Sequence, residues 1–165
     1  MIHEVTGDIL LSEADAIAHG VAPNDDFKQG LALALRTQWP SMYKDFRHYC
    51  HNRHPKEGTT WAWGGPGGAR IVALFTQKGA WDHGTHPGKA TSPNVNHALK
   101  ELRHTIEKEG WKSVALPRLA TGVGGLDWDD VRPLIDTHLG DLPTDVYIYA
   151  TYAPGTKASE TGAMG

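Results

Sequence analysis

The segment from Leu116 to Trp128 reads LPRLATGVGGLDW, and it has the residue types that could hold a phosphate group. A β-prone run leads into a loop with three glycines, and a helical segment is expected directly after it. Glycine lets the backbone approach a ligand closely, and a helix N-terminus adds partial positive charge. The pattern fits a phosphate site, but a tight strand-to-helix turn without a ligand is the more common meaning of such a short glycine pattern.

A second loop, residues 21–30, follows an earlier β-prone run in the matching place. Gly30 opens the next helical segment, so a further set of free backbone N–H groups is expected at the same edge of the sheet. Two loops of this kind on one edge favour a diphosphate over a single phosphate as the ligand.

Three titratable side chains lie close to these loops. His19 could act as a general acid or base near neutral pH, or it could be a buried histidine that donates to a backbone carbonyl. Asp25 and Asp26 could orient a water molecule, or they could be solvated loop carboxylates. Asp82 and His83 lie in the loop of residues 76–91, which could fold over the same site.

Three histidines, His48, His51 and His54, have the spacing of one helical face and could converge on a zinc ion. They lie near an expected helix end among basic residues, where most histidines are solvated. We therefore predict no metal site and no cofactor.

Strand and helix signals alternate along the chain, which predicts an α/β fold with a mixed, mostly parallel central sheet covered by helices on both faces. In such sheets, ligands bind beyond the carboxyl ends of the strands. The expected strands are residues 2–5, 14–20, 59–63, 69–75, 113–116 and 146–149. The expected helices are residues 30–36, 42–50, 93–109 and 127–139, with Ser41 and Ser92 as caps and Pro133 tolerable only near a first turn.

The length of 165 residues suits one domain, which we place at residues 1–152 with a flexible tail at 153–165. Sixteen Lys and Arg against 19 Asp and Glu give a formal charge of −3, so direct nucleic-acid binding is not expected. The single Cys50 fits a reducing compartment, most simply the cytoplasm. No apolar run approaches the roughly 20 residues that span a bilayer, and we expect a monomer without membrane contact.

Five short motifs follow one another in the order seen in macrodomains. They are GDIL at 7–10, IAHG at 17–20, GLA at 30–32, LFT at 74–76, and LP at 116–117 followed by Gly122 and Trp128. From residue 2 to about 151 the chain resembles this family. The most similar subclass contains the terminal ADP-ribose protein glycohydrolase and the yeast ADP-ribose phosphate phosphatase.

The resemblance implies a three-layer α/β/α macrodomain that binds ADP-ribose or an ADP-ribosylated protein. It gives Asp8 the role of the acid that reads adenine, whereas the local pattern alone would make Asp8 a turn former. Tyr152 could stack on adenine or could be an exposed aromatic at a strand end. The expected ligand-binding residues are Asp8, Ile9, His19, Phe27, Lys28, Gly30, Thr76, Ala120, Thr121, Gly122, Val123, Gly124, Gly125, Leu126 and Tyr152.

The chain departs from the glycohydrolase pattern at two positions. Gln77 stands where the glycohydrolase has a lysine that attacks the ribose, and Gly124 stands where it has an assisting aspartate. A glutamine cannot form a Schiff base, and Lys78, one residue further on, is expected to point the other way. The candidate catalytic residues are therefore His19, Asp25, Asp26 and Gln77.

Three functions remain open on this basis. The first is hydrolysis of ADP-ribose from modified protein carboxylates, and the second is a phosphatase acting on ADP-ribose phosphorylated at the distal ribose, with His19 involved. The third is a non-catalytic ADP-ribose reader, which the loss of the lysine and aspartate favours. A dinucleotide oxidoreductase is disfavoured because no G-x-G-x-x-G opens the first strand-to-helix turn.

Overall fold

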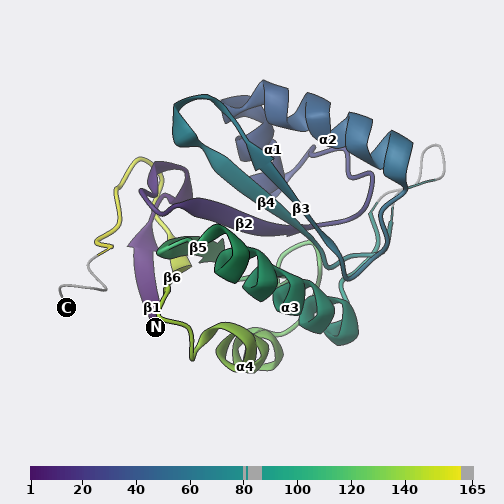
Figure 1. Cartoon of the computed structure of the whole chain (residues 1–165). Coiled ribbons are helices and arrows are strands. Elements are labelled where there is room, and N and C mark those ends of the chain that lie inside the picture. Colours follow the sequence, from purple (N-terminus) through teal and green to yellow (C-terminus); the bar gives the residue numbers. More distant parts are fainter. Residues whose placement is uncertain (80, 82–86, 161–165) are drawn as a thin grey trace.

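The computed structural model describes residues 1–79, 81 and 87–160, and it contains one six-stranded sheet in the order β1-β6-β5-β2-β4-β3 (Figure 1). All neighbouring pairs are parallel except β3 and β4, which form an antiparallel hairpin. The strands are β1 Ile2–Gly7, β2 Ala16–Val21, β3 Thr60–Gly64, β4 Arg70–Phe75, β5 Ser113–Pro117 and β6 Asp145–Tyr152. The helices are α1 Gly30–Gln38, α2 Pro40–Arg53, α3 Ser92–Glu109 and α4 Trp128–Leu139, with short 3-10 helices η1 Ile9–Leu11 and η2 Pro66–Gly68.

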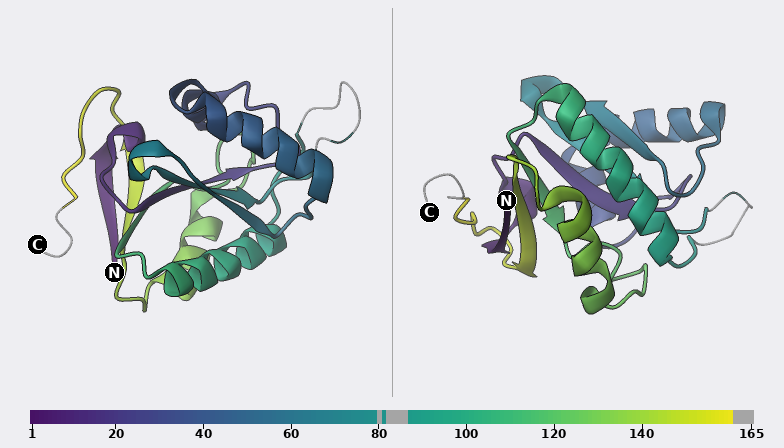
Figure 2. Two further views of the ribbon diagram at one scale, coloured as in Figure 1. Left: turned by 45° about the horizontal axis from the view of Figure 1, so that its top comes forward. Right: turned by 60° about the horizontal axis from the view of Figure 1, so that its bottom comes forward.

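The sheet is the middle of three layers, with α1 and α2 on one face and α3 and α4 on the other (Figures 1 and 2). Alternate residues of the strands enter different cores. In β2, Ala16 and Ala18 pack with α3 and α4, whereas Ile17 packs with α1 and α2. Because both faces are buried, the inner strands are mostly apolar, and His19 is a buried polar residue within β2. The predicted α/β/α fold with a mixed, mostly parallel sheet is confirmed.

Two helix starts differ from the predicted ones. The side chain of Thr91 caps α3 by accepting from the Asn94 N–H at 3.3 Å, so Ser92 is the first helical residue and not the cap. Helix α2 begins at Pro40, without a capping side chain at its start. Proline suits this place because its fixed φ fits a first turn and its missing N–H would have no partner there. The prediction of Ser41 as a cap is wrong.

Helix α4 carries Pro133 in its second turn, further from the start than the sequence led us to expect. Proline there removes one backbone hydrogen bond of the helix. The buried side chains of Val131, Ile135 and Leu139 hold this face of the helix against the sheet. Tertiary packing thus outweighs the local penalty.

The C-terminal segment 153–160 lies against β1 and η1 (Figure 2). The sequence led us to expect a flexible tail here. The Asp8 N–H donates to the Thr156 carbonyl at 2.7 Å, and Ala158 is buried. The five residues that follow lie outside the described part of the chain. The division of the chain at Tyr152 remains a prediction.

Within residues 1–79, 81 and 87–160, no helix has both the length and the apolar character needed to cross a membrane.

Candidate active site

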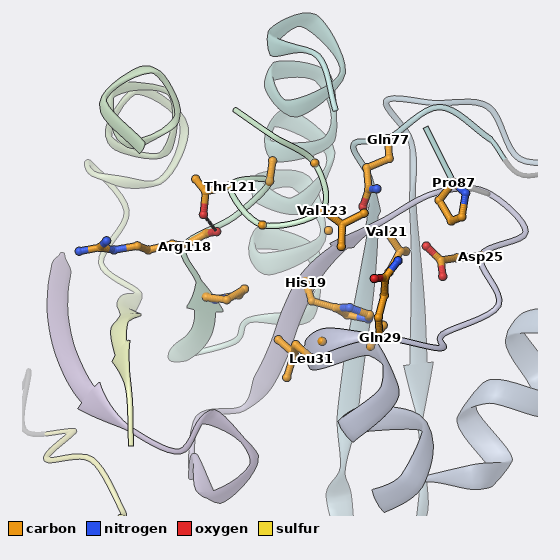
Figure 3. Close-up of a pocket in the computed structure, with 17 residues that line it drawn as sticks. His19, Val21, Asp25, Gln29, Leu31, Gln77, Pro87, Arg118, Thr121 and Val123 are labelled. Atoms are coloured by element: carbon orange, nitrogen blue, oxygen red, sulfur yellow. Dashed lines mark hydrogen bonds between the residues drawn. The ribbon is translucent and has the colours of Figure 1, made fainter. Parts of the chain in front are cut away.

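Two adjoining cavities open at the carboxyl edge of the parallel strands, between the loop after β2 and the loop after β5. The first has a volume of about 340 Å³ and the second about 410 Å³. Gly30, Leu31 and Pro117 line both, so the two cavities form one continuous cleft. The first cavity, shown in Figure 3, is glycine-rich and has the more polar lining of the two, whereas the second is almost entirely apolar.

The glycine loop after β5 forms one wall of the first cavity. Its backbone turns back on itself, since the Leu126 N–H donates to the Ala120 carbonyl at 3.0 Å and Ala120 has a φ of 64°. A Cβ on Gly124 would lie only 2.6 Å from the Ala120 carbonyl oxygen. A glycine is therefore required at this close approach. Of the predicted loop residues, five line the cavity: Ala120, Thr121, Gly122, Val123 and Gly124.

The loop after β2 forms the opposite wall, and the carboxylate of Asp25 organises it. One oxygen of Asp25 accepts from the Phe27 N–H at 2.8 Å, and the other accepts from the Ala22 N–H at 3.2 Å. The loop ends at Gly30, whose φ of 62° favours glycine and which starts α1 beside both cavities. Gln29 and Gly30 thus bring a helix N-terminus to the cleft, where its N–H groups can receive an anion.

The carboxyl group of Asp25 is buried and lines the cavity. Burial raises its pKa, while the two backbone N–H donors and Arg47 act in the opposite direction and Asp26 adds to the rise. A raised pKa makes the carboxylate a stronger base. Each oxygen also keeps a free lone pair, so Asp25 can hold and activate a water molecule.

His19 lies at the floor of the first cavity, with its ring edge-on to Phe27 at 5.6 Å. Its Nε2 is buried and has no hydrogen-bond partner among the described residues. Burial lowers the pKa of His19 to about 4. The imidazole is therefore neutral near pH 7, where it can accept or donate one hydrogen bond. The alternatives of a general acid or base and of a buried structural histidine remain predictions.

The burial of His19 predicts a pH dependence of stability. Between about pH 6.5 and 4 the unfolded chain binds a proton at this histidine and the native state does not. The free energy of unfolding should fall as the pH is lowered through this window, by on the order of 3 kcal/mol in all. The raised pKa of Asp25 acts in the opposite direction, because it makes the free energy of unfolding rise as the pH is lowered. Urea unfolding of the parent and of His19→Gln at each pH separates the contribution of the histidine. If the free energy of unfolding depends on pH in the same way for both proteins, the described burial of His19 is contradicted.

Phe27 was expected in the wall of the site, but its side chain is fully buried and packs on His19, Tyr43 and Phe46. Its φ of 53° turns the ring into the core while the loop backbone stays at the cleft. The prediction of Phe27 as a wall residue is thus wrong for its side chain.

Replacing Phe27 with alanine should lower the free energy of unfolding by about 3–5 kcal/mol, the usual cost of removing a buried aromatic ring. Chemical denaturation measures this directly. A loss of less than about 1 kcal/mol would contradict the described packing.

Besides Phe27 and Asp8, five predicted residues lie outside the lining of both cavities: Asp26, Lys28, Thr76, Gly125 and Leu126. Lys28 is exposed, and its Nζ lies 4.0 Å from a carboxylate oxygen of Asp26. The Asp26 carboxylate also accepts from the backbone N–H of Lys28. Thr76 is fully buried, with its hydroxyl beneath Gly20. The other two are Gly125 and Leu126, at the far end of the glycine loop.

Gln77 lines the first cavity, and its side chain donates to the Gly88 carbonyl at 2.9 Å. Lys78 is exposed and lies outside that lining. The expected alternation of side chains therefore holds at this position. Lys78 therefore points away from the cleft and does not replace the lysine that the glycohydrolase has at the position of Gln77.

The apolar cavity is lined by Ile9, Leu10 and Leu31 together with two tyrosines, Tyr149 and Tyr152. The ring of Tyr152 is 63% exposed and is free to cover a flat ligand. Asp8 lies behind this wall: one carboxylate oxygen accepts from the Leu10 N–H and the other from the Gly155 N–H, both at 3.0 Å. Both interpretations of Asp8 remain open, because each oxygen keeps a lone pair.

Sequence reasoning missed Arg118 at the cleft and Lys89 beside the far end of the glycine loop. Arg118 lines the first cavity at the loop start and lies 5.7 Å from the Trp128 ring, with its guanidinium pointing away from His19 in Figure 3. Lys89 packs over Gly125, where an added Cβ would lie 3.6 Å from its Cδ. Arg118 adjoins the glycine loop in sequence and could have been identified, but Lys89 lies more than 30 positions earlier.

No group of three or more potential metal ligands occurs within the described ranges. His48 pairs with Asn52 at 2.9 Å, and His54 stacks on Trp81 at 4.0 Å. Asp82 and His83 lie outside the described residues.

The Macro domain family model matches residues 19–135, which is well over half of the chain. Together with the glycine loop and the sheet order, this match shows that the chain belongs to the macrodomain family.

Its relatives include ADP-ribose hydrolases. The DNA ADP-ribosyl glycohydrolase of Mycobacterium tuberculosis is 28% identical over 163 residues, which is 97% of this chain and 45% of the relative. The ADP-ribose 1''-phosphate phosphatase of Chaetomium globosum is 25% identical over 158 residues, 85% of each chain. The macrodomain of Thermus aquaticus DarG superposes with a TM-score of 0.80 at 27% identity, covering 91% of this chain and 98% of that one. The chain spans less than half the length of the DNA ADP-ribosyl glycohydrolases it matches.

Proposed function

We propose that the chain binds the ADP-ribosyl group and hydrolyses the bond at the anomeric carbon of its distal ribose. The observation that carries this proposal is the pair of adjoining cavities, in which an apolar cavity with two tyrosines meets a glycine-rich cavity that contains His19, Asp25 and Gln77. An ADP-ribosyl group has the same order of parts: a flat base, a diphosphate and a second ribose.

The orientation follows from the chemistry of the two cavities. The adenine fits the apolar cavity, with the exposed ring of Tyr152 over it. The diphosphate lies between Gly30 and the glycine loop, where backbone N–H groups and a helix N-terminus receive it. The distal ribose then reaches the part of the cavity lined by His19, Asp25 and Gln77.

Hydrolysis by a bound water suits these residues better than a covalent route, because Gln77 supplies no nucleophile. Asp25 takes a proton from the water as the new C–O bond forms at the anomeric carbon. The bond to the attached group breaks with its electron pair, and the leaving atom gains a proton from solvent. His19 and Gln77 can fix the ribose hydroxyls, and the glycine-loop backbone can stabilise developing charge.

The nature of the attached macromolecule is the least constrained part of the proposal. The DNA ADP-ribosyl glycohydrolases among the relatives favour a nucleotide, whereas the sequence alone favoured a protein carboxylate. The chain's charge of −3 disfavours extended contact with a nucleic-acid backbone. We propose DNA-linked ADP-ribose, with contact limited to the nucleotides beside the modified one.

The experiment is a release assay with four substrates: ADP-ribose on a short single-stranded oligonucleotide, on a glutamate peptide, on a serine peptide and on an arginine peptide. The DNA-linked substrate should be cleaved fastest, and lengthening the oligonucleotide should change the rate little. Fastest release from the glutamate peptide would reverse the substrate assignment. No release from any of the four, and none from ADP-ribose 1''-phosphate, would leave a reader as the function.

A second candidate is a phosphatase acting on ADP-ribose 1''-phosphate. It rests on the Chaetomium relative, which matches over 85% of both chains and places the same distal ribose at the reacting end. Phosphate release from this ester, measured beside the four linkages above, separates the two activities.

The assembly and location of the protein are also proposals. We propose that the domain acts as a monomer in the cytoplasm; its single Cys50 is a free, buried thiol, which fits a reducing compartment. Sedimentation of the purified protein with ADP-ribose tests the first part, and a dimer would contradict it.

A further inference from the structure

The C-terminal segment 153–160, which we call the strap, contacts both ends of η1. This short helix supplies Ile9 and Leu10 to the apolar cavity. The strap therefore touches the structure behind the proposed adenine site, although it does not line the cavity itself.

At the start of η1 the strap binds Asp8. The Gly155 N–H donates to the Asp8 carboxylate at 3.0 Å, and the Asp8 N–H donates to the Thr156 carbonyl at 2.7 Å. The other carboxylate oxygen of Asp8 caps η1 at Leu10. Asp8 is thus held between η1 and the strap, with two independent hydrogen bonds to the latter.

At the end of η1 the strap contributes Glu160. Its carboxylate accepts from the Ser12 hydroxyl at 2.6 Å, the Glu13 N–H at 3.0 Å and the Tyr149 hydroxyl at 2.7 Å. Tyr149 is a wall of the apolar cavity, and burial together with Glu160 raises its pKa, so it remains a neutral donor. A single carboxylate therefore ties the end of η1 to one wall of the cavity.

The strap also packs tightly on the end of β1. A Cβ on Gly7 would lie 2.8 Å from the Ala158 Cβ and 2.9 Å from the Thr156 carbonyl oxygen. Because backbone atoms are among these neighbours, a larger residue at Gly7 would have to displace the strap.

We infer that the strap is a positioning element of the adenine site, and that Glu160 is its key positioning residue. It fixes η1, Asp8 and the Tyr149 ring before the ligand arrives, which reduces the ordering cost of binding. Without Glu160, three donors lose their shared acceptor and the apolar wall loosens. This inference rests on the proposed function, because it assumes that the apolar cavity holds adenine.

The test compares Glu160→Ala and Gly7→Ala with the parent protein, using calorimetry with ADP-ribose and AMP and magnetic-resonance titration with ribose 5-phosphate. Both variants should bind ADP-ribose and AMP about 10- to 100-fold more weakly, with ribose 5-phosphate unchanged. Lys157→Gln removes an exposed ion pair from the same strap to Glu13, and Gly64→Ala adds a methyl group where nothing lies within 4 Å. Both of these controls should match the parent.

Each outcome has a defined meaning. If the parent binds no ADP-ribose, the proposed function fails before the strap is tested. If the parent binds and Glu160→Ala, shown to be folded by its thermal transition, binds equally well, the strap is no positioning element. Equally weakened binding of ribose 5-phosphate would also overturn the inference, because it would indicate that the whole cleft has loosened and not only the adenine site. If Glu160→Ala does not fold, Glu160→Gln and Gly7→Ala carry the same comparison.

Discussion

Replacing Gly124 with valine should weaken ADP-ribose binding at least 100-fold. A Cβ at this position would lie 2.6 Å from the Ala120 carbonyl oxygen and 3.0 Å from the Ala90 Cβ. The glycine loop must then open, and its backbone N–H groups leave the positions proposed for the diphosphate. Calorimetric titration with ADP-ribose measures the effect.

Gly64→Ala is the control for this variant, because Gly64 lies outside the lining of both cavities. A Cβ on Gly64 meets no heavy atom within 4 Å, and its φ is outside the left-handed range. Binding by this variant should stay within about threefold of the parent. Normal affinity in the folded Gly124→Val protein would show that the loop does not hold the diphosphate.

Replacing Asp25 with asparagine should lower the rate of ADP-ribose release by about 10²–10⁴-fold, the usual contribution of a general base. The affinity for ADP-ribose should fall less than the rate does, because the amide keeps the size of the side chain but can accept from only one of the Phe27 and Ala22 N–H groups. Single-turnover release and calorimetry together separate these two effects.

Asp26→Asn provides the comparison, since Asp26 is the neighbouring carboxylate but lies outside the cavity lining. Its release rate should remain close to that of the parent. If Asp25→Asn also releases ADP-ribose at the parent rate, Asp25 only shapes its loop through the Ala22 and Phe27 N–H groups, and the general base must lie elsewhere.

The fold could be predicted because its signals are local. β2 is apolar except for His19, α3 has a clear apolar stripe ended by Gly110 in the left-handed region, and β3 and β4 flank a glycine-rich turn. The position of the glycine loop could be predicted for the same reason, because it joins a strand to a helix within one short segment.

What could not be predicted depends on contacts between distant segments. The burial that keeps His19 neutral comes from the layer of α1 and α2 as a whole, and the ring of Phe27 turns inward because of one positive φ. The bond between Asp8 and Gly155 joins residues 147 positions apart. No local pattern in a Gly- and Ala-rich C-terminal segment signals that it will pack on η1.

The central claim is that the joined cleft between Gly30 and the glycine loop binds ADP-ribose as a unit. Calorimetric titration of the unmodified protein with ADP-ribose tests it most directly. We expect a dissociation constant near 1 μM, which corresponds to about −8 kcal/mol, and binding at least 100-fold weaker for AMP, which lacks the distal half. The absence of binding heat and of any thermal shift with millimolar ADP-ribose would contradict the claim.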